Sequence, residues 1–517
     1  MVKKFIGNIL RNPTVAGLII NKLTNSALPR PYPFSLWAPP PALPPDATEA
    51  QRREAEKTYL SSVSDYTAWV GLFDQTYTKR HLPPASASFA KELPPVEEVL
   101  PLFRRSESSY KLSEHTSALF PFFAQWFTDS FLRTHPADWH KNTSNHEIDL
   151  CQIYGLKEST TSILRTHEGG RLKSQMINGE EYPPFLCEEK GGEVVIKEEF
   201  RDLPNMQLLV ENYKKSFVVR AGLSEEESQQ RLLKFYAAGL DRANSSIGYS
   251  LMNTIFIRGH NHISKKLQQA YSDWDDERLF QTTRNILIVI LLKIVVVDYI
   301  KHISGGSICA MPKIGFAEKQ KWYRKNWMAV EFTLLYRWHI LIPDALQVSE
   351  EQSVLWQQFM YNPGVLSEHG VVPLAQLWSK QAAGASGLFN TPDFLMEAKR
   401  SSLEFSRKAR LRSYNEYRQA FGFKKLNSLD ELDTTEESKK ALKELYQNDI
   451  NKVEFLVGLW AENPSAVEWY GEKAGLYPSM FGPSILTMVG VDAFSQALTN
   501  PLLSENIYNA DTFSKVG

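Results

Sequence analysis

A tyrosine and a histidine stand three residues apart in the string Tyr336-Arg337-Trp338-His339. The apolar neighbours of this string predict a helix over Lys319–Ile340, and residues three apart on a helix share one face. On that face an imidazole can bind a metal, while the phenol exchanges an electron or a hydrogen atom with a group beside it. The alternative is that both side chains are packed core residues. The remainder of the chain decides between these interpretations.

Composition sets limits on the class of protein. The chain has 517 residues, 43% of them hydrophobic and 12% aromatic, which is enough for a large buried core. Lys and Arg number 58 against 59 Asp and Glu, so the net charge offers no electrostatic basis for nucleic-acid binding. A basic stretch from Lys399 to Arg412 is expected to form a solvated helix face. The cysteines (Cys151, Cys187 and Cys309) predict neither a disulfide framework nor a metal site, which suits a cytoplasmic location.

The N-terminal region predicts two segments before the main domain. Residues 1–28 carry two short amphipathic helices separated by Pro13, which are expected either to lie in a membrane interface or to pack on the protein's own core. Polar residues interrupt them, so a secretory signal is not expected. Residues 29–45 are rich in proline and predict a stiff, extended connector without sheet pairing. Residues 46–517 are expected to form one large domain.

The hydrophobic spacing of that domain is almost entirely helical. Helices are predicted over Asp46–Phe73 with Asp46 as N-cap, Ala118–Leu132, Glu225–Ala238, Tyr249–Ala270, Asp276–His302, Lys319–Ile340 and Phe394–Phe421. Glu193–Ile196 is a short strand candidate. The expected fold class is therefore mainly α.

Several further strings occur in a fixed order: Phe122–Phe131, His146–Leu150, Tyr182-Pro183-Pro184, Arg258–Asn261, Asp276–Arg284, Asp298-Tyr299, Tyr336–His339 and Ala493-Phe494-Ser495. In this order they resemble the animal-type haem peroxidase superfamily, and within it the cyclooxygenase (prostaglandin G/H synthase)-like fatty-acid dioxygenases. The resemblance implies a large helical domain that holds haem b and its iron. It favours peripheral membrane contact for the N-terminal helices, and relatives often form homodimers.

The resemblance also assigns roles to individual residues. His339 is implied as the proximal iron ligand, with Trp338, Thr128 and Gln125 next to the cofactor. Tyr336 is implied as the residue that becomes a radical and abstracts hydrogen from an unsaturated acyl chain, to which dioxygen then adds. The acyl channel is expected to be lined by Ser495, Tyr299, Leu335, Phe332, Ile300 and Ile303.

Several positions depart from the family pattern. Four residues after Gln125 the family has a proton-shuttling histidine, whereas this chain has Asp129, which is either a substitute acid–base or the mark of a lost peroxidase activity. Arg242 falls where the myeloperoxidase branch has its distal arginine, and it is expected to polarise a peroxide oxygen or to form a structural salt bridge. Leu456 replaces a tyrosine that supports the proximal imidazole, which predicts a weaker push on the iron. Gly306 replaces the tyrosine of the family's carboxylate anchor.

The first functional hypothesis is haem-dependent dioxygenation of an unsaturated fatty acid to a hydroperoxide, with dioxygen or a hydroperoxide as co-reactant. One alternative is iron-centred chemistry, as in a hydroperoxide isomerase or peroxygenase. The other is a degenerate member that binds haem or lipid without turnover.

Overall fold

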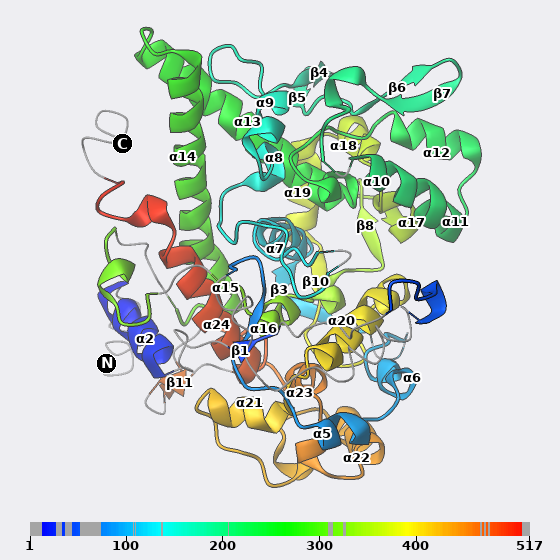
Figure 1. Ribbon diagram of the computed structural model, residues 1–517, viewed down its shortest axis with the longest axis vertical. Coiled ribbons are helices and arrows are strands. Elements are labelled where there is room, and N and C mark those ends of the chain that lie inside the picture. Colours follow the sequence, from blue (N-terminus) through cyan, green and yellow to red (C-terminus); the bar gives the residue numbers. More distant parts are fainter. Residues whose placement is uncertain are drawn as a thin grey trace.

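The computed structural model describes residues 13–26, 34–36, 44–51 and 74–508, with short gaps at 107, 109, 136–137, 205, 309–313, 324–326, 466–467, 470–471 and 474–475. Helices dominate this part of the chain, and its strands form only two-stranded sheets (Figure 1). The mainly α prediction is confirmed. None of the described helices is long and apolar enough to cross a membrane.

Two long helices, α13 (Ile247–Ala270) and α14 (Asp276–Ile294), pack against each other and form the frame of the molecule (Figure 1). Each begins at a side-chain cap. The Ser246 hydroxyl accepts a hydrogen bond from the third amide of α13, and the Asp275 carboxylate does the same for α14. The predicted helices over these residues are confirmed.

Helix α7 (Leu119–Thr128) packs across α13. Gly248 on α13 permits the contact, because a Cβ at this position would lie 2.1 Å from Cγ of Phe122. The indole N–H of Trp126 donates to Oδ1 of Asn253 at 2.7 Å, which anchors α7 to α13 through a buried polar contact. The spacing between the two helices is thus set by a glycine and by a tryptophan.

Beyond α14 the helix continues through a π-helical turn, η5 (Val295–Tyr299), into α15 (Ile300–Ile303). The predicted helix to His302 is confirmed, with this π-helix inserted. A π-helical turn changes the direction in which side chains leave the helix, and such turns are frequent at functional sites. Here the turn ends at Tyr299, and η5 packs against α24 (Pro483–Leu498).

The predicted helix Lys319–Ile340 is wrong over most of its length. The structure has α16 (Val330–Leu335) and, after a turn, the 3-10 helix η7 (His339–Leu341). The indole N–H of Trp338 donates to the carbonyl of Leu335, and it occupies an acceptor that a continuing helix would use. The tyrosine and histidine of the string therefore lie on either side of a turn instead of on one helical face.

The predicted helix Phe394–Phe421 is likewise divided, into α20 (Met396–Lys408) and α21 (Tyr414–Ala420). Ser413 and Glu416 form a capping box that starts α21 as a separate helix. The expectation of a solvated basic face on this stretch is also wrong. Lys399 is completely buried, Arg407 forms an ion pair with Glu454, and Arg410 donates to the carbonyl of Ala85.

The remaining helices are α5 (Ala87–Glu92), α6 (Val96–Val99), α8 (Cys151–Tyr154), α9 (Glu158–Leu164), α10 (Met206–Asn212), α11 (Val218–Ala221), α12 (Glu225–Leu232), α17 (Trp356–Phe359), α18 (Gly364–His369), α19 (Val371–Lys380), α22 (Glu436–Leu445) and α23 (Phe455–Ala461). The antiparallel strand pairs are β3 (Leu112–Ser117) with β10 (Ala382–Gly384), β4 (Gln175–Ile177) with β5 (Glu180–Tyr182), β6 (Cys187–Lys190) with β7 (Glu193–Ile196), β8 (Ala345–Gln347) with β9 (Ser353–Leu355), and β11 (Glu468–Trp469) with β12 (Glu472–Lys473). The strand prediction at β7 is confirmed, whereas the helix predicted to Ala238 ends earlier, with α12.

The N-terminal segments are described in part. The second amphipathic helix is α2 (Pro13–Ser26), which packs against α24, and Asn21 accepts a hydrogen bond from the Trp322 indole at 3.1 Å. Residues 1–12 lie outside the described part of the chain. Membrane contact stays a prediction. Within the proline-rich connector, β1 (Phe34–Ser35) pairs with β2 (Lys79–Arg80), so the expected lack of sheet pairing is wrong there.

The helix predicted over Asp46–Phe73 is described only at its start, because residues 52–73 lie outside the described ranges. The predicted N-cap, Asp46, is wrong. Thr48 caps the helix: its hydroxyl accepts from the Gln51 amide at 3.2 Å, and the Gln51 side chain accepts from the Thr48 amide at 2.8 Å.

Candidate active site

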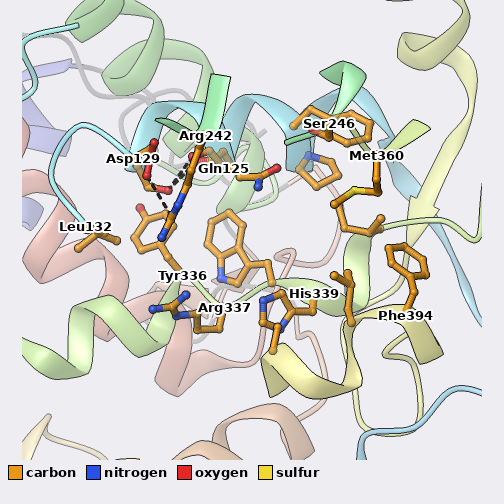
Figure 2. Close-up of a pocket in the computed structure, with 18 of the residues that line it drawn as sticks. Gln125, Asp129, Leu132, Arg242, Ser246, Tyr336, Arg337, His339, Met360 and Phe394 are labelled. Carbon is orange, nitrogen blue, oxygen red and sulfur yellow. Dashed lines mark hydrogen bonds and ion pairs between the residues drawn. The ribbon is translucent and has the colours of Figure 1, made fainter. Parts of the chain in front are cut away.

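A cavity of about 260 Å³ lies between α7 on one side and the turn before η7 on the other (Figure 2). All the residues predicted for catalysis and cofactor contact line it, namely Gln125, Thr128, Asp129, Arg242, Tyr336, Trp338 and His339. The apolar part of its wall includes Phe122, Leu132, Ile342, Phe359, Met360, Phe394, Leu395 and Ala398. The structure thus brings two segments separated by about two hundred residues onto one cavity with both polar and apolar walls.

His339 is held in its neutral form. Burial, together with the positive charges of Lys399 and Arg337, places the pKa of His339 well below its ordinary value. Its Nδ1 is buried and has no hydrogen-bond partner among the described residues. A neutral imidazole can coordinate a metal, and in most such sites the second nitrogen is hydrogen-bonded. Leu456, at the position of the family's supporting tyrosine, is buried and supplies no polar atom.

The backbone around His339 is fixed by a residue that sequence reasoning missed. Arg105 donates from Nη2 to the carbonyls of Ile340 and Ile342, each at 3.1 Å, and forms an ion pair with Asp344 at 3.0 Å. Close approach of β10 completes the support, because a Cβ at Gly384 would lie 2.1 Å from the Ile340 carbonyl oxygen. No local motif around Arg105 could have indicated this role, since its partners lie more than two hundred residues further along the chain.

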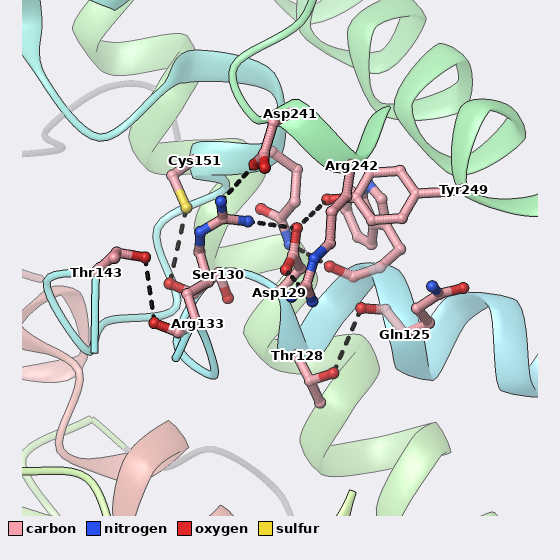
Figure 3. A network of polar contacts seen from close by, with 12 residues as sticks. Gln125, Thr128, Asp129, Ser130, Arg133, Thr143, Cys151, Asp241, Arg242 and Tyr249 are labelled. Atoms are coloured by element: carbon pink, nitrogen blue, oxygen red, sulfur yellow. Dashed lines mark hydrogen bonds and ion pairs between the residues drawn. The ribbon is translucent and has the colours of Figure 1, made fainter. Parts of the chain in front are cut away.

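The distal carboxylate of Asp129 is saturated with donors (Figure 3). Its Oδ1 accepts from Nη1 of Arg242 at 3.0 Å, and its Oδ2 accepts from Nη1 of Arg133 at 2.9 Å and from the Tyr249 hydroxyl at 2.6 Å. Only 2% of Asp129 is exposed. Of the two alternatives for Arg242, the salt bridge with Asp129 is therefore present. The geometry favours a carboxylate that holds Arg242 in place over one that shuttles protons.

Arg133 and Tyr249 were not predicted as site residues. Arg133 also pairs with Asp241, so it bridges two carboxylates. Burial and the neighbouring Asp129 carboxylate raise the pKa of Tyr249, which keeps its hydroxyl proton on the hydrogen bond. The one sequence signal was that Arg133 follows Asp129 by four residues.

By contrast, the Gln125 side chain is exposed to the cavity and makes no hydrogen bond to the described residues, so it is free to contact a bound molecule.

Tyr336 lies at the cavity wall in an aromatic environment. Its ring stacks on Trp338 at a centroid distance of 4.6 Å and contacts Phe332 edge-on at 5.1 Å. Burial raises the pKa of both Tyr336 and Tyr299, and the two phenols lie close enough to perturb each other electrostatically. Neither hydroxyl forms a hydrogen bond within the described part of the chain. Both tyrosines are thereby kept in the protonated form.

The residues predicted to line an acyl channel are placed differently from the cofactor residues. Ser495, Tyr299, Leu335, Phe332, Ile300 and Ile303 are all buried, and none of them lines the cavity. They gather on α16, α24 and the η5–α15 segment, behind Tyr336 as seen from the cavity-lining residues. The channel assignment therefore stays a prediction. The predicted anchor region around Gly306 is described, whereas Arg30 is outside the described ranges.

Comparison with known proteins agrees with this geometry. The family model for animal haem peroxidases matches residues 97–475. Prostaglandin G/H synthase 2 of Equus caballus is 30% identical over 473 residues, which is 89% of this chain and 70% of that protein. The Gallus gallus protein of the same name is 32% identical over 432 residues, or 81% of this chain and 66% of the relative. The chain thus spans about two thirds of the length of these relatives.

Solved structures show the same fold at lower identity. A fatty acid alpha-dioxygenase of Oryza sativa superposes with a TM-score of 0.65 at 16% identity, covering 98% of this chain and 88% of its own. Peroxidase A of Dictyostelium discoideum gives 0.64 at 17% identity, with 85% and 89% covered. The protein is a haem-dependent oxidoreductase. It belongs to the animal haem peroxidase family, in its cyclooxygenase-like branch.

The cavity fits the family's cofactor. A neutral imidazole faces it from η7, the Gln125 amide, which bonds to no described residue, faces it from α7, and much of the remaining wall is apolar. His339 would hold the iron, and the orphaned Nδ1 is an observation specific to this chain. None of the described residues bonds to that nitrogen, and the weaker push on the iron expected from Leu456 stays a prediction.

Proposed function

We propose that this protein oxygenates a fatty acid, with Tyr336 as the residue that abstracts hydrogen, to give a hydroperoxide. The observation that carries the proposal is the position of Tyr336, half-buried with a buried hydroxyl oxygen at the wall of the cavity that His339 also lines. Relatives support the substrate class: those in sequence are prostaglandin G/H synthases, and one structural neighbour is a rice fatty acid alpha-dioxygenase solved with palmitic acid.

The residues divide the chemistry as follows. Haem, when bound on His339, supplies the oxidising equivalent that removes an electron from Tyr336. The phenolic proton would be taken up with that electron by the oxidised cofactor, and Tyr299, whose phenol interacts with that of Tyr336, can hold the resulting ring in place. The tyrosyl oxygen then takes a hydrogen atom from the acyl chain, so that its O–H bond forms as a C–H bond breaks. Dioxygen adds to the carbon radical, and the peroxyl radical recovers the hydrogen atom from Tyr336 to give the hydroperoxide.

Burial makes this scheme practicable. The raised pKa of Tyr336 keeps the phenol protonated before oxidation, so that each cycle starts from a full O–H bond. The stacked Trp338 and the edge-on Phe332 pack against the Tyr336 ring and restrict the approach of other hydrogen donors to it. The chain itself therefore supplies orientation and protection, while the cofactor supplies the redox change.

A second candidate function is iron-centred conversion of a hydroperoxide. It is favoured by the donor-saturated Asp129, because a distal side without a proton shuttle is poorly suited to peroxidase turnover. Gln125 and Arg242 would then be the groups left to contact a peroxide.

Dioxygen uptake by the haem-loaded protein separates the two candidates. The substrates are saturated and polyunsaturated fatty acids, each with a trace of hydroperoxide, and the variants are Tyr336→Phe and, as a matched control, Tyr323→Phe on the surface. We expect uptake by wild type and Tyr323→Phe, and none by Tyr336→Phe with an unchanged haem spectrum. Uptake that survives in Tyr336→Phe would contradict the radical role. Hydroperoxide consumption without uptake in wild type would favour the second candidate.

A further inference from the structure

Arg337 lines the same cavity as His339, yet none of the described carboxylates forms an ion pair with it. Its Nε is buried without a hydrogen-bond partner, and no ion pair links its guanidinium to any carboxylate in the described part of the chain (Figure 2). The backbone of Arg337 is used, since its carbonyl accepts a hydrogen bond from Nζ of Lys399 at 3.5 Å. The side chain is the part that lacks a partner.

Other arginines with little exposed surface in this molecule are paired. Arg133 contacts Asp129 and Asp241, Arg105 contacts Asp344 and three carbonyls, and Arg165 contacts Asp276 and Glu277. This is the usual arrangement, because a guanidinium removed from water without a counter-ion is costly. An unpaired guanidinium at a cavity wall is therefore a sign that a ligand completes it.

A second guanidinium faces the same space. Arg242 lies on the 3-10 helix η4 (Asp241–Asn244), and its side chain extends towards Tyr336 (Figure 2). Only its Nη1 is engaged, by Asp129, and its side chain remains 43% exposed. Arg337 and Arg242 both line this cavity, so one bound group can contact both guanidiniums. Three guanidiniums, from Arg133, Arg242 and Arg337, thus face only two carboxylates.

We propose that Arg337 and Arg242 together bind a carboxylate of a ligand in this cavity. Guanidinium groups suit this chemistry, because their planar N–H donors match the two oxygens of a carboxylate. Asp129 cannot serve, since its two oxygens are occupied by three donors. The carboxylate has two sources: a propionate of haem, or the headgroup of a fatty acid. The fatty-acid source rests on the proposed function, whereas the haem source does not.

The first test uses the protein without haem. Replacing an unpaired buried cation with an apolar side chain of similar length removes the free-energy cost of its desolvation. Removing a paired cation instead leaves its carboxylates buried without a counter-ion, which lowers stability. We therefore expect Arg337→Met to unfold at the same or a higher urea concentration than wild type, and Arg133→Met to unfold at a lower one. Equal destabilisation of both variants would show that Arg337 has a protein partner, and would overturn the proposal.

The second test identifies the ligand group. Haem and haem dimethyl ester are titrated into wild type, Arg337→Met, Arg337→Gln and Arg242→Met, and binding is followed by the absorption of the complex. If a propionate is bound, free haem binds wild type at least about tenfold more tightly than the diester, and this preference disappears in the Arg337 variants. Arg337→Gln keeps a polar side chain and guards against a folding failure of Arg337→Met.

The third test addresses the other source of the carboxylate. If the haem preference is unchanged in the variants, palmitic acid and its methyl ester are titrated into the haem-loaded proteins. A preference for the free acid that is lost with Arg337 assigns the site to the substrate. If the variants keep the wild-type preference for the free acid in both titrations, the proposed carboxylate site is overturned. If the preference for haem over its diester is lost in the variants and no fatty acid supports dioxygen uptake, the carboxylate site is retained and the proposed function is rejected.

Discussion

Replacing Asp129 with asparagine tests whether this residue is a structural clamp or a proton shuttle. Asparagine keeps the size of the side chain but removes its charge. Its NH₂ group also replaces one of the two acceptor oxygens, so the N–H or O–H groups on that side would face another donor. Arg133, Arg242 and Tyr249 contact the carboxylate at 2.9, 3.0 and 2.6 Å. Breaking a buried ion pair by removing one partner costs about 3–5 kcal/mol. Arg133 retains Asp241 and Arg242 is partly exposed, so we expect the lower end, about 3 kcal/mol.

The assay is urea unfolding of the wild type and the variant at pH 7, with and without haem. Tyr249→Phe is the matched control, because it removes only the shortest of the three hydrogen bonds and should cost about 1–2 kcal/mol. A clamp predicts that Asp129→Asn loses stability in both forms and that peroxidase turnover falls only as the fold is lost. If the variant is as stable as wild type but its peroxidase turnover collapses with an unchanged haem spectrum, the clamp is wrong and Asp129 acts as the acid–base.

Three further predictions follow from the same structure. His339→Ala should leave the apoprotein folded but abolish the haem absorption band, measured by titration; an unchanged band would remove His339 as the ligand. Gly248→Ala should destabilise the protein by about 1–3 kcal/mol in urea unfolding, because the added Cβ would lie 2.1 Å from Phe122; wild-type stability would show that α7 and α13 can separate freely. Burial, and to a smaller extent the positive charge of Arg337, lower the pKa of Lys399 from 10.5 to about 7. Between these values the unfolded chain binds more protons than the folded one, so this residue makes stability rise with pH from about 7 to about 10. Lys399→Met should therefore stabilise the protein most below pH 7 and progressively less above it, and a difference that does not vary with pH would contradict the assignment.

The sequence by itself determined the class of the molecule and the cavity-lining residues expected to take part in catalysis and cofactor contact. Helical periodicity was sufficient for α13 and α14, because these helices are long and begin at side-chain caps, and for α7, because its residues are almost all apolar. The order of motifs identified Gln125, Tyr336 and His339, and the structure places all three at one cavity. Even the departure at Asp129 was visible in the sequence, since it is a change of residue type at a known spacing.

Tertiary structure decided what those residues can do. The sequence could not show that Tyr336 and His339 lie on either side of a turn, because the turn depends on a side-chain hydrogen bond from Trp338. It also predicted a solvated face where Lys399 is buried. The partners of Asp129, and the lack of an ion-pair partner for Arg337 among the described residues, depend on side chains brought together from distant segments. Local periodicity carries no information on such contacts, because pairing and desolvation are settled only when the helices pack.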